Sequence, residues 1–250
     1  MNACDLDLAF VAAGVADLDS RVARIDWSGV TDELDAQGAA TIKHLLAPAE
    51  CQALAAMYDR DEAFRSRVVM SRHGFGQGEY RYLRYPLPPL VAALRAAVYE
   101  RLAPLANRWH EAMGLAARFP ERHREFIALC HTAGQTKPTP LLLRYEAGDY
   151  NCLHQDLYGE HVFPLQLVLL LSQPGRDFDG GEFVVTEQRP RMQTRAMVLP
   201  LAQGDAAVIA VRHRPVRGAR GCYRVNLRHG VSRVHAGHRC TAGIIFHDAA

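Results

Sequence analysis

The second half of the chain alternates short apolar stretches with turns and shows no helical spacing. Eight stretches have the length and composition of β-strands: 141–145, 151–157, 162–171, 182–186, 194–199, 206–211, 222–228 and 239–246. Glycine-containing clusters such as Asp179-Gly180-Gly181 separate them, as is typical of turns. A parallel sheet would need helices between its strands. The pattern therefore predicts antiparallel strands arranged as a jelly roll, also called a double-stranded β-helix.

The first half of the chain reads mainly as helices. Helical candidates at 49–58, 90–102 and 121–130 each follow a proline, a residue that the first helical turn tolerates well. We expect a break or kink at Pro104, because proline in a helix interior removes a hydrogen bond. The predicted fold class is mainly β with α. The predicted organisation is an N-terminal extension at 1–25, a mostly helical region at 26–138 packed on the core, and the β core at 139–250.

The composition is that of one globular domain, with 49% hydrophobic and 22% charged residues. A formal net charge of +2 does not by itself indicate a nucleic-acid partner, and we attribute the excess of Arg over Lys to codon bias. The six cysteines form no CxxC pair, and the N-terminus lacks the pattern of a secretory signal. Both features predict a cytoplasmic protein. No apolar run approaches the roughly 20 residues of a membrane span, so no membrane partner is expected.

Three residues in the predicted β region have the chemistry of metal ligands: His154, Asp156 and, at long range, His229. Two histidines and one carboxylate hold the metal of non-haem Fe(II) oxygenases and leave coordination positions open. His154 and Asp156 face the same side if their segment is extended, since side chains at i and i+2 of a strand share a face. A lone His-x-Asp pair arises often by chance, and four other histidines compete for the distal position. These are His213, His235, His238 and His247.

The order of these residues resembles the Fe(II)/2-oxoglutarate-dependent dioxygenase superfamily, in which a distal His and then a basic residue follow the His-x-Asp pair. Further matching segments are Tyr145-x-x-Gly148, Gly180-Gly181-Glu182, Pro200-x-x-x-Gly204-Asp205, and Arg239 ten residues after His229. The resemblance implies that His154, Asp156 and His229 hold Fe(II). The aspartate at position 156 distinguishes the chain from the halide-binding variants, so halogenation is not expected. Mn, Co, Ni and Zn accept the same ligands, which leaves the native metal open.

Over almost everything after Ile25, the chain also resembles a bacterial family of 2-oxoglutarate oxygenases labelled as acting on damaged nucleic acid. The segments that carry this resemblance are 65–70, 73–76, 107–109, 154–161, 186–191 and 245–248. It implies an enzyme that couples oxidative decarboxylation of 2-oxoglutarate, with O₂, to hydroxylation or oxidative demethylation of a substrate. No catalytic residue beyond the metal ligands is expected.

Two residues are assigned to the co-substrate by the same resemblance. Arg239 would bind the far carboxylate of 2-oxoglutarate, because a guanidinium matches a carboxylate through two parallel hydrogen bonds. The alternative for Arg239 is a structural ion pair. Tyr145 resembles the tyrosine that donates a hydroxyl hydrogen bond to 2-oxoglutarate in alkylation-repair demethylases. The alternative for Tyr145 is a core position at the start of a strand.

The substrate is the least constrained prediction. Two arginine-rich segments, 72–85 and 212–228, are candidates for the substrate mouth. Their candidate residues are Arg72, Tyr80, Arg81, Tyr82 and Arg214. Aromatic rings beside arginines suit an exposed nucleic-acid base with its phosphates. The alternative for 72–85 is a strand with inward tyrosines and outward arginines.

Several functions remain open on this sequence. Nucleic acid, a small molecule and a protein side chain are all alternatives for the substrate. The arginines after His229 are placed differently from those of the alkylation-repair demethylases, which weakens base demethylation. A second class of function is a non-enzymatic sensor that binds a metal or 2-oxoglutarate on the same barrel.

Overall fold

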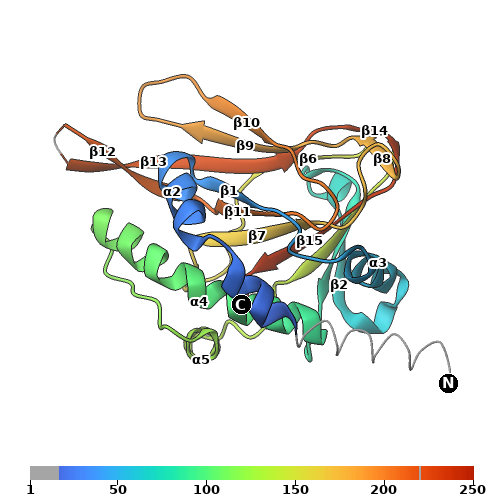
Figure 1. The fold of residues 1–250 in the computed structure, drawn as a ribbon, viewed down its shortest axis with the longest axis horizontal. Coiled ribbons are helices and arrows are strands. Elements are labelled where there is room, and N and C mark those ends of the chain that lie inside the picture. The colour runs from blue at the N-terminus through green and yellow to red at the C-terminus, as the bar shows by residue number, and fades with distance from the viewer. Residues whose placement is uncertain (1–16, 220) are drawn as a thin grey trace.

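The computed structural model describes residues 17–219 and 221–250, and its centre is two antiparallel sheets that face each other (Figure 1). The large sheet has the strand order β1-β11-β7-β15-β5-β4-β2, and the small sheet has the order β10-β9-β13-β6-β3 with β12 paired to β13. A separate two-stranded ladder joins β14 to β8. The predicted jelly roll is confirmed.

The strands of the second half lie where the apolar stretches predict them. Their bounds are β5 Leu141–Tyr145, β6 Tyr150–His154, β7 Leu165–Leu170, β9 Phe183–Gln188, β10 Arg195–Leu199, β11 Ala206–Ala210, β13 Gly221–Val231 and β15 Arg239–Ile245. Three further short strands were not predicted: β8 Phe178–Gly180, β12 His213–Gly218 and β14 Val234–Gly237. β12 and the first half of β13 form a hairpin that extends beyond the end of β6.

The region 26–138 is less helical than predicted, because it adds strands to both sheets. β1 (Ala39–Ile42) pairs with β11, and β4 (Glu79–Leu83) pairs with β5, so both continue the large sheet. β2 (Phe64–Val69) pairs with β4, and β3 (Gly76–Gln77) pairs with β6 in the small sheet. This region therefore forms part of the sheets as well as packing on them.

Four α-helices of this region have defined bounds: α2 Trp27–Gln37, α3 Pro48–Ala56, α4 Pro89–Ala112 and α5 His123–Thr132. Three short 3-10 helices lie at Met57–Asp59, Asp61–Ala63 and Met70–Arg72. A break at Pro104, one of the two expected outcomes, does not occur, because α4 continues through it; a kink there stays a prediction. Pro104 lies on the exposed side of α4, while its neighbours Leu102 and Leu105 are buried in the core. Tertiary packing on both sides of the proline therefore offsets the lost backbone hydrogen bond. No helix among the described residues is long and apolar enough to cross a membrane.

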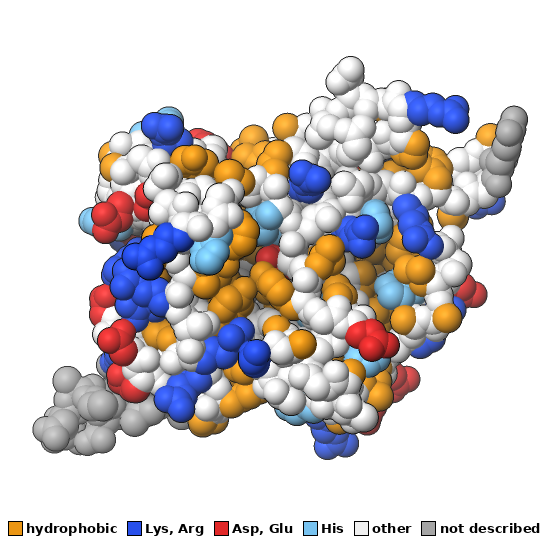
Figure 2. Space-filling model, turned by 180° about the vertical axis from the view of Figure 1, so that it is seen from behind, with side chains coloured by type: hydrophobic (Ala, Val, Ile, Leu, Met, Phe, Trp, Pro, Cys, Tyr) orange, Lys and Arg blue, Asp and Glu red, His pale blue; other side chains and the backbone are white. Residues whose placement is uncertain are grey.

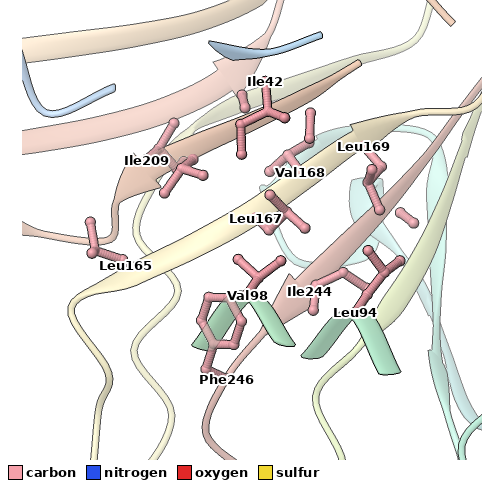
Figure 3. Packing of buried hydrophobic residues seen from close by; sticks show 14 of the residues in the cluster. Ile42, Leu94, Val98, Leu165, Leu167, Val168, Leu169, Ile209, Ile244 and Phe246 are labelled. Atoms are coloured by element: carbon pink, nitrogen blue, oxygen red, sulfur yellow. The ribbon is translucent and has the colours of Figure 1, made fainter. Parts of the chain in front are cut away.

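The core lies between α4 and the inner face of the small sheet, with β7 in the middle. All six residues of β7 are buried, as expected of a strand covered on both faces. Leu167 packs with Val98 of α4 and Ile244 of β15 on one face (Figure 3). Gln166 and Val168 point the other way, into a cavity between the sheets. The one polar residue of this apolar run thus faces that cavity.

Candidate metal centre

A cavity of about 220 Å³ opens between the two sheets. Its walls carry side chains from β4, β5, β7 and β15 of the large sheet and from β6, β9 and β13 of the small sheet. Figure 2 shows the face on which the molecule is hollowed, with apolar side chains and an acidic side chain inside the hollow and basic side chains around it.

His154, Asp156 and His229 meet in this cavity, and one ligand atom of each lies within 4.8 Å of the others. His154 ends β6 and stands directly opposite His229 in the antiparallel ladder between β6 and β13. Asp156 follows the end of β6, so it reaches the site from a loop and not from the extended strand that the sequence predicted. Its Oδ2 lies 3.4 Å from Nε2 of His229, and its Oδ1 lies 3.7 Å from Nε2 of His154.

The electrostatics of Asp156 and His154 favour the protonation states in which these two residues bind metals. Burial alone would raise the pKa of Asp156, but the hydrogen bond from His229 and the charges of both histidines hold it well below its usual range. Burial lowers the pKa of His154, and the neighbouring His229 lowers it further. A carboxylate and neutral imidazoles are the forms that coordinate a divalent cation. The donor set therefore fits a metal bound by two nitrogens and one oxygen.

Neighbouring groups fix how these ligands point. The ring Nδ1 of His154 donates a hydrogen bond of 2.8 Å to the carbonyl oxygen of Cys152, which leaves Nε2 free to face Asp156. The hydroxyl of Tyr158 donates to Oδ1 of Asp156 at 2.8 Å, and the hydroxyl of Tyr82 donates in turn to Tyr158 at 3.0 Å. Such partners hold ligands in place and tune a metal site. The sequence did not predict Tyr158; its place two residues after Asp156 was the available signal.

An unpaired cation is buried in the same cavity. Arg239 stands opposite Tyr145 in the ladder between β15 and β5, and both side chains line the cavity. Arg239 is 1% exposed, forms no salt bridge within the described chain, and its Nε and Nη1 have no hydrogen-bond partner. Burial lowers the pKa of Arg239 and raises that of Tyr145 to about 12. A buried guanidinium without a counter-charge is costly unless an anion joins it.

Residues 78–249 match the model of a family described as "Oxygenase, catalysing oxidative methylation of damaged DNA". The chain belongs to this oxygenase family. Its resemblance to the 2-oxoglutarate oxygenases is thereby confirmed, and it is an Fe(II)- and 2-oxoglutarate-dependent oxygenase that also uses O₂.

One curated relative and two solved structures are also similar to this chain. The oxygenase is 47% identical to "Uncharacterized protein MT2286" of Mycobacterium tuberculosis over 165 residues. This aligned region covers 66% of this chain and 71% of that protein. In fold it is similar to a Pseudomonas putida prolyl-4-hydroxylase, with a TM-score of 0.52, 15% identity, and coverage of 87% of this chain and 96% of that one. A Trichoplax adhaerens prolyl hydroxylase in complex with a hypoxia inducible factor peptide has a TM-score of 0.56, 12% identity and coverage of 87% and 86%.

The candidate substrate residues of 72–85 lie in different places: Tyr80, Arg81 and Tyr82 alternate between the two faces of β4, and Arg72 precedes that strand. Tyr80 lines the cavity of the oxygenase, and Tyr82 joins it through Tyr158. Arg81 lies on the opposite face and pairs with Asp61, whereas Arg72 is exposed just before the loop that leads to β3. β4 therefore matches the alternative of a strand with inward tyrosines and outward arginines, and Arg81 does not reach the cavity.

The structure also corrects the placement of Arg214 at the substrate mouth. Arg214 is 2% exposed, pairs with the buried Glu187 of β9, and donates a hydrogen bond of 2.8 Å to the carbonyl oxygen of Asp35 in α2. Its cross-strand partner Val225 is also buried, which shows that Arg214 lies on the inner face of β12. Arg214 therefore ties the hairpin to α2 and has no free donor group at the cavity.

This placement predicts a stability effect without a binding effect. Arg214→Ala leaves Glu187 buried without its main counter-charge, so we expect the free energy of unfolding to fall by about 3 kcal/mol. The concentration of 2-oxoglutarate that half-saturates the enzyme should stay unchanged. Urea unfolding and a titration with 2-oxoglutarate measure the two quantities. A raised half-saturation with unchanged unfolding would place Arg214 at the site after all.

The hydroxyl of Tyr158 gives a second prediction. In Tyr158→Phe, Asp156 loses one hydrogen bond and its fixed orientation, so we expect the dissociation constant for Fe(II) to rise by about 10-fold. Anaerobic titration with Fe(II) measures it. Tyr150→Phe is the control, because the hydroxyl of Tyr150 forms no hydrogen bond with the described part of the chain and Tyr150 does not line the cavity. Equal iron affinity in both variants would show that Tyr158 does not orient the ligand.

Proposed function

We propose that His154, Asp156 and His229 hold the iron of the oxygenase and that Arg239 and Tyr145 hold 2-oxoglutarate. The observation that carries this proposal is that three converging metal-ligand atoms and one unpaired buried guanidinium share a single cavity. A divalent cation and a dicarboxylate are the two species whose charges these groups balance. Arg239 takes the far carboxylate, and the hydroxyl of Tyr145 is a further donor toward it.

The residues of the chain hold, orient and shield the reactants. Bound iron and 2-oxoglutarate supply the oxidising chemistry, in which O₂ is consumed, 2-oxoglutarate yields succinate and CO₂, and one oxygen atom enters the substrate. The cation of Arg239 fixes the direction in which 2-oxoglutarate enters. The apolar side chains of Leu143, Val168 and Phe183 line the cavity and exclude water from the reaction. No side chain needs to act as a nucleophile.

We propose damaged nucleic acid as the substrate, in line with the description of the matching family. Phe75 lines the cavity at its rim, is 46% exposed, and stacks on His73 with the ring centroids 5.3 Å apart. An exposed aromatic ring at the entrance suits a base turned out of its stack, since stacking on aromatic side chains is a common way to hold one. Hydroxylation of an N-methyl group gives a hydroxymethyl group that leaves as formaldehyde, so we expect the methyl group to be removed.

The proposal is tested by an oxygen-pulse experiment. Fe(II) and 2-oxoglutarate are added anaerobically to metal-free protein while the visible charge-transfer absorption is recorded. Air and a methylated oligonucleotide are then added, and succinate and formaldehyde are measured. We expect the absorption to appear and then decay as both products form. Absorption without succinate would favour the sensor, and succinate with small molecules or peptides but not with oligonucleotides would overturn the substrate.

A further inference from the structure

The arginines of 212–228 that the site does not use lie on the hairpin of β12 and β13. Side chains alternate between the two faces of a strand, and Val225 and Leu227 are buried while Arg224 and Arg228 are exposed. Arg217 of β12 lies opposite Cys222, which shares the outer face of β13 with these arginines. The outer face of the small sheet therefore carries a line of three arginines.

One end of this line of arginines lies beside residues that line the cavity. Arg228 immediately precedes His229 on β13, and Gln155, between the two ligands of the His-x-Asp pair, donates hydrogen bonds to Asn226 and to the carbonyl oxygen of Leu227. Six residues separate Arg228 from Cys222, which corresponds to a strip of about 20 Å at about 3.3 Å per residue. In Figure 2, basic side chains occupy the surface to the right of the hollow.

The charges of this face are not balanced within the described chain. Among the outward-facing residues of β9, β10, β12 and β13 that the structure describes, none is an aspartate or glutamate. Arg217 and Arg228 form no salt bridge or side-chain hydrogen bond there, whereas Arg224 donates one to the carbonyl oxygen of Met113 at 2.9 Å. Glu187, the acid of β9, points inward to Arg214. Two guanidinium groups are thus free for a polyanion.

We infer that this outer face, with Arg217 and Arg228 as its main contacts, docks the phosphate backbone of the nucleic acid whose damaged base enters the cavity. The inference rests on the proposed substrate. Among its described residues, this face has no outward Phe, Tyr or Trp, and its one aromatic ring is the half-buried imidazole of His213. It therefore lacks the row of rings on which single-strand binders stack bases. A strip of about 20 Å spans about six base pairs at 3.4 Å each. Its contacts fit a duplex backbone, while the cavity takes the base.

The test measures binding of a fluorescently labelled methylated duplex to the full-length protein, without iron or 2-oxoglutarate, at several salt concentrations. The logarithm of the affinity falls with the logarithm of salt by about 0.9 per phosphate contact. In Arg217→Ala/Arg228→Ala we expect weaker binding and a slope smaller by about 2. Arg217→Lys/Arg228→Lys should keep the slope. Arg101→Ala/Arg124→Ala removes the same charge from exposed positions of α4 and α5 and should bind like the wild type.

The outcomes separate this inference from the proposed function. An unchanged affinity and slope in Arg217→Ala/Arg228→Ala overturns the docking surface, even if the wild type forms succinate and formaldehyde with the duplex. An equal loss in the Arg101→Ala/Arg124→Ala control also overturns it, because net charge would then explain the binding. A selective loss of slope supports the docking surface even if no oligonucleotide is oxidised, in which case the substrate proposal fails alone. Thermal unfolding checks that all variants are folded.

Discussion

Replacing His229 with alanine is expected to abolish the iron-dependent reaction. Partners that merely orient a metal ligand contribute about 10- to 100-fold to metal affinity or activity, so removal of a ligand should cost more than about 100-fold. His229 is 5% exposed and supplies the nitrogen that lies 3.4 Å from Asp156. The variant should show no charge-transfer absorption with Fe(II) and 2-oxoglutarate and no succinate after air is admitted.

The control for this variant is His44→Ala, which removes an imidazole whose side chain is 83% exposed. It should keep the absorption and the succinate yield. Circular dichroism of both variants should match the wild type, because neither side chain forms the apolar core. Iron binding and turnover in His229→Ala at wild-type levels would contradict the assignment and return the other histidines to consideration.

Replacing Arg239 with alanine should separate the co-substrate from the metal. A hydrogen bond to a charged group contributes about 1.5–3 kcal/mol, and each 1.4 kcal/mol corresponds to a factor of about 10. We expect the concentration of 2-oxoglutarate at half-saturation to rise by about 10- to 100-fold, while the affinity for Fe(II) changes little. Succinate formation at increasing 2-oxoglutarate, and anaerobic iron titration, measure these two effects.

Arg239→Lys serves as the informative comparison, because it keeps the charge but loses the two-pronged geometry. We expect its half-saturation to lie between those of the wild type and Arg239→Ala. Arg233→Ala, an exposed arginine beyond the end of β13, is the charge control and should leave 2-oxoglutarate binding unchanged. A different result would show that Arg239 has only a structural role: Arg239→Ala would be less stable than the wild type, but its folded fraction would bind 2-oxoglutarate with the wild-type affinity.

Apolar patterns predicted the central strands of the β core, such as β7, β11 and β15, because nearly all of their residues are buried. Leu165–Leu170 is a continuous apolar run apart from Gln166, and it is the strand covered on both sides. One strand of the first half, β2, was missed for the opposite reason. Phe64–Val69 has two arginines among its six residues and no buried position, so only its pairing with β4 makes it a strand. Pairing between distant segments does not show in local composition.

The candidate site shows the same division between local and long-range information. The pair His154 and Asp156 could be predicted from its local spacing. His229 and Arg239 could be predicted from the resemblance to the 2-oxoglutarate-dependent dioxygenases. The roles of Tyr158 and Gln166 could not be predicted from local spacing, because each depends on a neighbour from another strand or loop. Tyr158 meets Tyr82, and the side-chain nitrogen of Gln166 lies 3.2 Å from Nε2 of His229. Arg214 was misplaced because charge alone does not reveal which face of a hairpin a residue occupies.

The entry of β1 and β4 into the large sheet has a consequence for how the chain is made. Both strands leave the ribosome well before β11 and β5, the strands with which they pair. Their backbone groups must wait for partners that are translated later, and such distant pairing slows folding and leaves strand edges open to other chains. During synthesis, therefore, the first half should depend on chaperones until the last strand of the large sheet, β15, is in place.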